Sequence, residues 1–126
     1  MIHLDTNVLI RALVQNTPHA QRVEQWLAAG EEMRISDVAW CEFLCGPVTA
    51  EQTQLAETAL GPPIPFSSED ATVAARLFNL GGRRRGSMVD CMVAATSIRA
   101  ASELATENVD DFMRFETHGL RLVRLT

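Results

Sequence analysis

The chain has 126 residues with a formal net charge of −5 at pH 7, and 47% of its residues are hydrophobic. This length and composition predict one globular domain over residues 1–126, and the absence of a signal peptide or a bilayer-spanning apolar run predicts a cytoplasmic protein that does not enter a membrane. All 11 basic residues are arginine, which excludes α/β mechanisms that require a catalytic or phosphate-binding lysine.

The first ten residues predict a buried strand that passes directly into a helix. Ile2 and Leu4 suit a short strand that ends at Asp5. The apolar residues after it recur at helical spacing, at Val8, Leu9, Ala12 and Leu13. Asp5 therefore lies beyond the carboxyl end of a strand, where open α/β sheets bind their ligands. The alternative is that Asp5 only caps the helix.

The rest of the chain alternates further strands with helices. Strands are expected at 33–36, 104–106 and 120–125, with 64–66 as a candidate for a very short one that contains Pro65. Helices are expected from Thr17–Pro18 to Gly30, from Ser36 or Asp37 to about Cys45, from Thr49 to Gly61, from Ser67 or Ser68 to Gly81, at Met88–Ala101 after Ser87, and at Val109–Phe115. This order predicts an α/β protein with three layers, α/β/α, around a mainly parallel central sheet of four to five strands.

Acidic or amide side chains follow several of these strands or, in the case of Asp90, lie early in the long apolar helix. They are Asp5, Glu42, Asp90, Asn108, Asp110 and Asp111. Because the carboxyl ends of parallel strands lie along one edge of a sheet, we expect these residues to converge although they are far apart in the sequence. Converging carboxylates repel one another, so they require raised pKa values or a bound divalent cation. Oxygen ligands of this kind suit Mg²⁺ or Mn²⁺ rather than zinc.

A divalent ion with open positions lowers the pKa of a bound water and polarises a phosphoryl group, so the predicted chemistry is phosphodiester hydrolysis. The candidates for the shell around the ion are Thr6, Asn7, Ser36 and Asp110, although Thr6 and Asn7 can instead cap the first helix. Two other α/β chemistries are excluded. The turn at residues 5–7 has no glycine for a dinucleotide-binding motif, and residues 81–87 lack the lysine of a phosphate-binding loop.

Three consecutive arginines, Arg83, Arg84 and Arg85, precede the helix that carries Asp90. The acidic net charge disfavours nucleic acid as a partner, yet these arginines are candidates to hold an RNA backbone beside the acidic residues. The alternative is a solvated turn. The three cysteines are interpreted as reduced core residues, at Cys41, Cys45 and Cys91.

Four segments stand in this order: Asp5–Leu9, Ser36 with Glu42–Phe43, Val89–Ala95, and Thr106–Asn108 with Asp111–Phe112. Together they resemble the signature segments of PIN domains, and more narrowly those of the VapC-type toxins of bacterial toxin–antitoxin pairs. The resemblance spans essentially the whole chain. It implies a three-layer α/β fold, a Mg²⁺- or Mn²⁺-dependent ribonuclease, a homodimer, and inhibition by a small antitoxin whose tail enters the active groove.

The resemblance also implies roles for individual residues. Asp5, Glu42 and Asp90 match the three acids that bind metal in PIN domains. The fourth position holds Asn108 where many members have Asp, and Asp111 or Asp110 supplies the remaining charge, so the number of metal ions stays open. The expected catalytic residues are Asp5, Glu42, Asp90, Asn108 and Asp111, in an endoribonuclease that acts as a VapBC-type toxin.

Two alternatives to this hypothesis remain. One is a PIN-like module that binds RNA or protein without cleavage, although a site freed from catalysis has no reason to crowd charges. The other is a PIN nuclease that acts in RNA processing or repair without an antitoxin.

Overall fold

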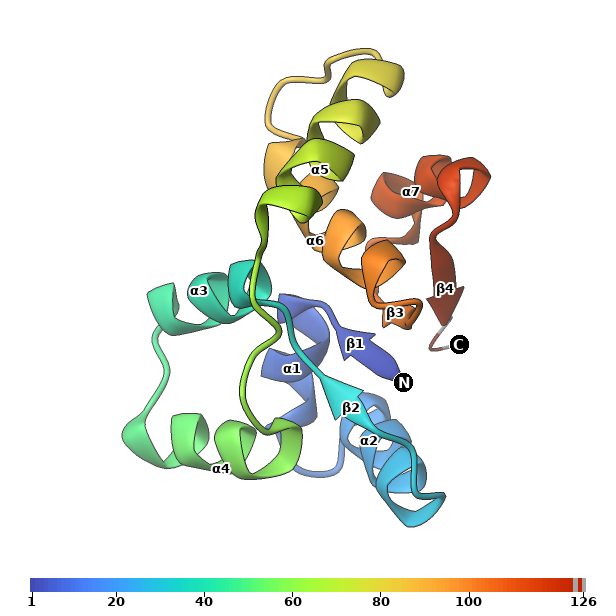
Figure 1. The fold of residues 1–126 in the computed structure, drawn as a ribbon. Coiled ribbons are helices and arrows are strands. Elements are labelled where there is room, and N and C mark those ends of the chain that lie inside the picture. The colour runs from blue at the N-terminus through green and yellow to red at the C-terminus, as the bar shows by residue number, and fades with distance from the viewer. Residues whose placement is uncertain (124, 126) are drawn as a thin grey trace.

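The computed structural model describes residues 1–123 and 125. Within these residues one sheet of four parallel strands has the order β2–β1–β3–β4 (Figure 1). The strands are β1 (Ile2–Leu4), β2 (Met33–Arg34), β3 (Glu103–Ala105) and β4 (Arg121–Val123). The predicted α/β fold with a mainly parallel sheet is confirmed. Residue 124 of the predicted last strand lies outside the described residues.

The predicted strand at 64–66 forms only a single bridge beside the sheet. Ile64 pairs with Ser36 through two backbone hydrogen bonds, from Ile64 N–H to the oxygen of Ile35 and from Asp37 N–H to the oxygen of Ile64, both 2.8 Å. Pro65 follows directly, and proline has no N–H with which to extend a ladder. The expectation of four to five strands is therefore met at its lower bound.

Seven α-helices lie among the described residues, at α1 (Thr6–Ala12), α2 (Pro18–Ala28), α3 (Asp37–Cys45), α4 (Ala50–Leu60), α5 (Ser68–Leu80), α6 (Met88–Arg99) and α7 (Val109–Phe112). A 3₁₀ helix, Met113–His118, continues α7. The N-cap hydroxyls of Thr17, Ser36, Thr49 and Ser67 accept a backbone N–H bond as the sequence predicts. Ser87 is the exception, because its hydroxyl donates to the carbonyl oxygen of Arg84 at 2.7 Å instead.

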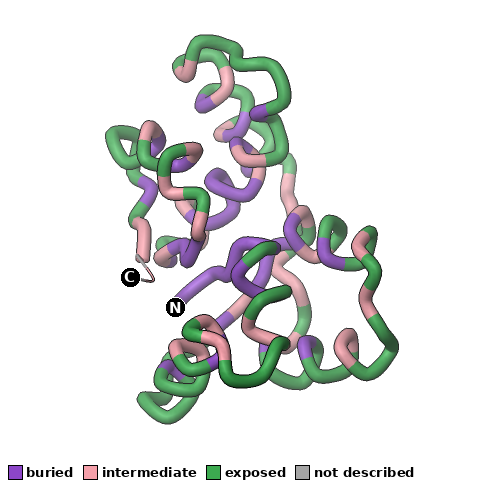
Figure 2. Tube along the Cα trace, turned by 180° about the vertical axis from the view of Figure 1, so that it is seen from behind, coloured by how far each residue is buried: buried purple, intermediate pink, exposed green. Residues whose placement is uncertain are grey.

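Helices cover both faces of the sheet, since every residue of β1 is buried (Figure 2). The connection from β1 to β2 contains α1 and α2, and the connection from β2 to β3, which crosses back past β1, contains α3 to α6. Right-handed crossovers in opposite directions put α1 and α2 on one face and α5 and α6, which pack against each other, on the other face, while α3 packs against α1. None of the described helices is long and apolar enough to cross a membrane.

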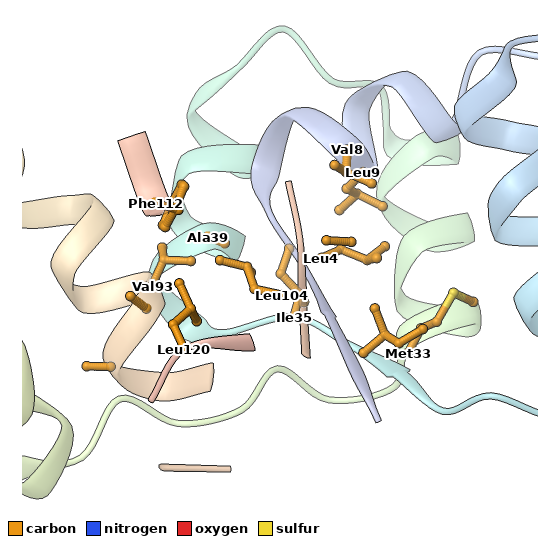
Figure 3. Packing of buried hydrophobic residues seen from close by; sticks show 14 of the residues in the cluster. Leu4, Val8, Leu9, Met33, Ile35, Ala39, Val93, Leu104, Phe112 and Leu120 are labelled. Carbon is orange, nitrogen blue, oxygen red and sulfur yellow. The ribbon is translucent and has the colours of Figure 1, made fainter. Parts of the chain in front are cut away.

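The core joins the sheet to both helical layers (Figure 3). Leu4 of β1 and Leu104 of β3 are fully buried beside Ile35, while Val93 of α6 and Phe112 of α7 close the cluster at one end. Burial of this kind contributes about 2 kcal/mol per large apolar side chain. The two central strands, and the residues directly after them, Asp5 and Thr106, are therefore held firmly in place.

The structure corrects two predictions about which side chains face the core. Cys41 and Cys45 are exposed, and only Cys91 is buried. The inner face of α3 is formed by Ala39 and Phe43, and a residue two positions from Ala39 on a helix points to the opposite side.

Candidate active site

Asp5 lies at the carboxyl end of β1 and is bound from two sides. Its Oδ1 accepts the N–H of Thr6 at 2.9 Å, and its Oδ2 accepts the hydroxyl of Thr106 at 2.9 Å. Thr106 directly follows β3, which pairs with β1 in parallel register. Asp5 therefore caps α1 and also joins the ends of the two central strands. Its role as a helix cap is compatible with its place at the edge of the sheet where ligands bind.

Thr6 links Asp5 to Glu42 of α3. Its hydroxyl lies 3.1 Å from Oε1 of Glu42 and 3.2 Å from the carbonyl oxygen of Ala39, and its single proton serves both acceptors. Thr6 thus donates to Asp5 through its backbone and to Glu42 through its side chain. The two carboxylates, 37 positions apart in sequence, share one threonine as a hydrogen-bond donor.

Asp90, in the first turn of α6, is close enough to these acids to be affected by their charges. The pKa of Asp90 is raised from 3.8 to about 6. Burial is the largest cause, and the charges of Asp5, Asp111 and Glu42 contribute to the same shift. The guanidinium of Arg114 opposes the shift and lowers the pKa. Asp90 therefore lies near enough to Asp5, Glu42 and Asp111 for their charges to shift its pKa.

The pKa values of Asp5 and Glu42 are shifted in the same direction. Burial raises the pKa of Asp5, the hydrogen bonds from Thr106 and Thr6 oppose this effect, and the charges of Asp111 and Glu107 add to it. Burial also raises the pKa of Glu42, against the hydrogen bond from Thr6 and together with the charge of Asp5. Mutual repulsion of this kind is relieved by a cation.

The loop after β3 forms an acidic rim beside Asp5. The N–H of Asn108 donates to the hydroxyl of Thr106 at 3.0 Å, and the N–H of Asp111 donates to the carbonyl oxygen of Asn108 at 3.0 Å. Residues 107–111 line a depression of about 500 Å³. Asp110 is exposed there, and Asn7 is exposed on the first turn of α1. Ser36 is buried, and its oxygen accepts the N–H of Ala39 as a helix cap rather than reaching the acids.

Residues 82–86, in the loop between α5 and α6 that carries the three arginines, are exposed. Arg83 has a φ of 56°, and its guanidinium binds Oδ1 of Asn79 and lies over the ring of Phe78. Arg84 and Arg85 are exposed beside it. Arg114, from the 3₁₀ helix, is the guanidinium that acts on Asp90, and it lies over the ring of Phe115 at 4.5 Å.

The donor set has the chemistry of a divalent-cation site, but it is not a preformed cage. Carboxylate oxygens with raised pKa values suit a hard cation such as Mg²⁺ or Mn²⁺. Across residues 1–123 and 125, however, no three His, Cys, Asp or Glu side chains form a group that could hold a metal ion as they stand. The acids are near enough to one another for the charge of a neighbouring acid to raise the pKa of each of Asp5, Glu42 and Asp90.

A family model described as the PIN domain matches residues 2–116 of the chain. The chain belongs to the PIN domain family. No curated protein matches it in sequence. The predicted resemblance to PIN domains is thereby confirmed, and it extends over nearly the whole chain.

Solved structures with the same fold come from toxin–antitoxin complexes. A chain of the VapBC2 complex from Rickettsia felis, bound to a promoter DNA fragment, superposes with a TM-score of 0.77 at 20% identity, covering 98% of each chain. A chain of a toxin–antitoxin complex from Klebsiella pneumoniae gives 0.77 at 24% identity, covering 100% of this chain and 98% of that one. FitAcB from Neisseria gonorrhoeae gives 0.71 at 21% identity, covering 99% and 98%.

Three residues of this PIN domain contact or act on the acids without having been predicted as site residues. Thr106 donates a hydrogen bond to Asp5, the charge of Arg114 lowers the pKa of Asp90, and the charge of Glu107 raises the pKa of Asp5. The parallel pairing of β1 with β3 is the signal that could have found Thr106, since it places the residues after both strands side by side. Glu107 lies within the Thr106–Asn108 segment of the PIN resemblance, whereas Arg114 approaches Asp90 from another part of the fold and no local pattern marks it.

Proposed function

We propose that this PIN domain is a divalent-metal-dependent endoribonuclease and acts as the toxin of a VapBC-type toxin–antitoxin pair. The observation that carries the proposal is the grouping of Asp5 and Glu42, which share Thr6 as a hydrogen-bond donor, with Asp90, whose pKa rises to about 6 through burial and further through the charges of Asp5, Asp111 and Glu42. Unrelieved repulsion among carboxylates at the carboxyl ends of parallel strands favours a cation-binding role. Membership of the PIN family and the likeness to chains of toxin–antitoxin complexes support it.

Asp5, Glu42 and Asp90 are the proposed ligands of Mg²⁺ or Mn²⁺, and the bound ion would supply a water of lowered pKa and a polarised phosphoryl group. Asp5 is held by Thr6 and Thr106, so it sets the position of the site. Glu42 accepts one hydrogen bond, from Thr6, and can approach Asp5 by rotation of its long side chain. Asp5 would thus stay in place while Glu42 rotates toward it to bind the ion.

The residues around these acids have proposed supporting roles. Asn108 offers a neutral amide, and Asp111 a further charge, from the rim of the depression. Asp110 is available at the same rim. Arg84 and Arg85, exposed before α6, are proposed to contact RNA phosphates, because guanidinium groups bind phosphate in a bidentate manner. Arg83 has a smaller part in this role because Asn79 already binds it.

Cleavage of a structured RNA by the purified chain tests the proposal. We expect Mn²⁺- or Mg²⁺-dependent cleavage that EDTA abolishes, and loss of cleavage to background in Asp5→Asn, Glu42→Gln and Asp90→Asn. Glu51→Gln, exposed on α4, is the matched control and should keep the wild-type rate. Asp5→Asn or Asp90→Asn protein that still cleaves RNA at the wild-type rate in magnesium would refute the assignment.

One observation favours a second function, a PIN-like module that binds RNA or protein without cleavage. Among the described residues the acids do not form a ready-made metal cage. Calorimetric titration with Mn²⁺ separates the two functions, because the nuclease requires a saturable site that Asp90→Asn removes. A chain that binds RNA but does not bind Mn²⁺ and does not cleave RNA would support the binding module.

The proposed partners are a small antitoxin and a second copy of the chain. A short reading frame upstream that encodes a DNA-binding protein, and that inhibits cleavage when co-expressed, would support the antitoxin. Its absence would favour a PIN nuclease of RNA processing. Light scattering of the purified chain measures the proposed homodimer directly, with twice the 13.9 kDa chain mass as the expected value.

A further inference from the structure

Glu107 joins the loop after β3 to two helices that lie beside the site. Its Oε2 is 3.1 Å from Nε of Arg11 on α1, and its Oε1 contacts Nε2 of His19 on α2. The side chains of Glu107 and His19 are only 22% and 15% exposed. A carboxylate bound by two donors from separate helices, and partly shielded from water, is held more firmly than one in an ordinary surface ion pair.

The residues on either side of Glu107 belong to the candidate site. Thr106 donates its hydroxyl to Asp5 and accepts the N–H of Asn108, whose carbonyl oxygen accepts the N–H of Asp111. Any movement of residue 107 is therefore passed to both neighbours. Anchoring Glu107 restrains the hydroxyl that holds Asp5 and the turn that presents Asn108 and Asp111.

The charge of Glu107 also needs these two partners. Glu107 is near enough to Asp5 to affect its ionisation, so an unpaired carboxylate here would add to the repulsion within the site. Arg11 and His19 bind this carboxylate from the side of α1 and α2. The loop can thus be anchored by an acid without adding an uncompensated charge to the acids around Asp90.

We propose that Glu107 is a positioning residue that, together with Arg11 and His19, clamps residues 106–111 onto α1 and α2 and so keeps Asp5, Asn108 and Asp111 in place for the metal. Glu107 itself touches neither metal nor substrate. The inference rests on the proposed function. A merely stabilising ion pair would change the melting temperature and leave the loop and the metal affinity unchanged.

The test compares Glu107→Gln with a matched control in the full-length chain. Glu32→Gln is that control, because Glu32 also pairs with an arginine, Arg34, at 3.3 Å but lies two residues from its partner at the far end of the sheet. Amide hydrogen exchange of the metal-free chain, read by NMR at Asn108 and Asp111, reports on the loop. We expect exchange there to be roughly three- to fivefold faster in Glu107→Gln, the effect of losing an ion pair, and unchanged in Glu32→Gln.

Titration calorimetry with Mn²⁺ reports on the site. Loss of residues that hold metal ligands in place weakens metal binding by about 10–100-fold, and we expect the lower end of that range for Glu107→Gln. In RNA cleavage, kcat should fall while KM for RNA changes little, since Glu107 does not touch the substrate. His19→Gln retains an N–H donor for Glu107 and should keep most of the affinity, whereas His19→Ala should not.

Three results decide the matter. Exchange at Asn108 and Asp111 that is equal in Glu107→Gln and Glu32→Gln overturns the clamp. Faster exchange with unchanged Mn²⁺ affinity overturns its positioning role. A wild-type chain that binds no Mn²⁺ and cleaves no RNA overturns the proposed function and this role with it, whereas failure seen only in the variant, in an active wild-type background, overturns this inference alone.

Discussion

Replacement of Asp90 with asparagine should stabilise the metal-free protein at neutral pH. The pKa of Asp90 rises from 3.8 to about 6 through burial and the charges of Asp5, Asp111 and Glu42. A carboxyl whose pKa is higher in the folded state destabilises the fold as the pH rises past its unfolded pKa, and fully above its folded pKa, because folding opposes its ionisation. The two pKa values differ by about 2, which corresponds to roughly 3 kcal/mol as an upper bound. Solvent screening of this partly exposed group reduces the expected gain to about 1–2 kcal/mol.

The sign of the effect fixes its pH dependence. Below about pH 4 the carboxyl is protonated in both the folded and the unfolded chain, so the variant has no advantage there. The advantage should appear between pH 4 and 6 and stay constant above pH 6. For a chain of this size 1–2 kcal/mol corresponds to a rise in melting temperature of about 3–8 °C.

Thermal unfolding in EDTA at pH 4, 5, 6 and 7.5 measures this difference, with Glu24→Gln, exposed on α2, as the control. Saturating Mn²⁺ should then reverse the ranking, because a ligand that binds only the folded state stabilises it by about 2.7 kcal/mol at 100 times Kd, and Asp90→Asn has lost that site. A variant no more stable than wild type at pH 7.5 in EDTA, or one whose advantage grows as the pH falls, would refute the reasoning.

Three further predictions concern His3, Thr6 and Gly81. Both ring nitrogens of His3 are buried without a hydrogen-bond partner among the described residues, and burial chiefly lowers its pKa from 6.5 to about 4. Between pH 7 and 4.5 the His3 ring is therefore protonated in the unfolded chain but not in the folded one, so the free energy of unfolding should fall by about 2 kcal/mol over this range. His3→Leu should abolish that part of the loss, as measured by urea unfolding. Thr6→Val removes the hydroxyl that binds Glu42, and calorimetry should show Mn²⁺ binding about tenfold weaker with the fold retained. Gly81→Ala places a Cβ 2.9 Å from the backbone oxygen of Leu77 and should lower the free energy of unfolding by about 1–3 kcal/mol in the same assay.

The fold could be predicted from the sequence wherever the signal is local. The capping box of Thr49 and Gln52 begins α4 where expected, and the alternation of strands with helices predicts the parallel sheet. Predictions failed where the outcome depended on neighbours that only the folded chain supplies. Ile64 has the side chain of a strand residue but forms one bridge, and Cys41 has the size of a core residue but lies on the outer face of α3.

The candidate site divides in the same way. Asp5 could be singled out because its place after the first strand is a property of a few adjacent residues. Asp90 lies near Asp5 and Glu42 because of the parallel topology, which the order of elements predicts. The ion pairs of Glu107 with Arg11 and His19 join residues more than 80 positions apart, and neither partner differs locally from an ordinary surface residue. Contacts of this kind leave no trace in periodicity or spacing.

The two roles of Asp5 explain why the acids are hydrogen-bonded so unequally. As a helix cap, Asp5 must accept from Thr6, and as a link between strands it accepts from Thr106, so both of its oxygens are already engaged. These two hydrogen bonds lower the pKa of Asp5, against the larger effect of burial, which raises it. The pKa of Asp90 rises to about 6, first because its carboxyl is partly buried and further because Asp5, Asp111 and Glu42 carry charge nearby. Because burial and repulsion both disfavour the charged forms of Asp5 and Asp90, a cation placed between them would favour their ionisation and offset this part of the cost of folding.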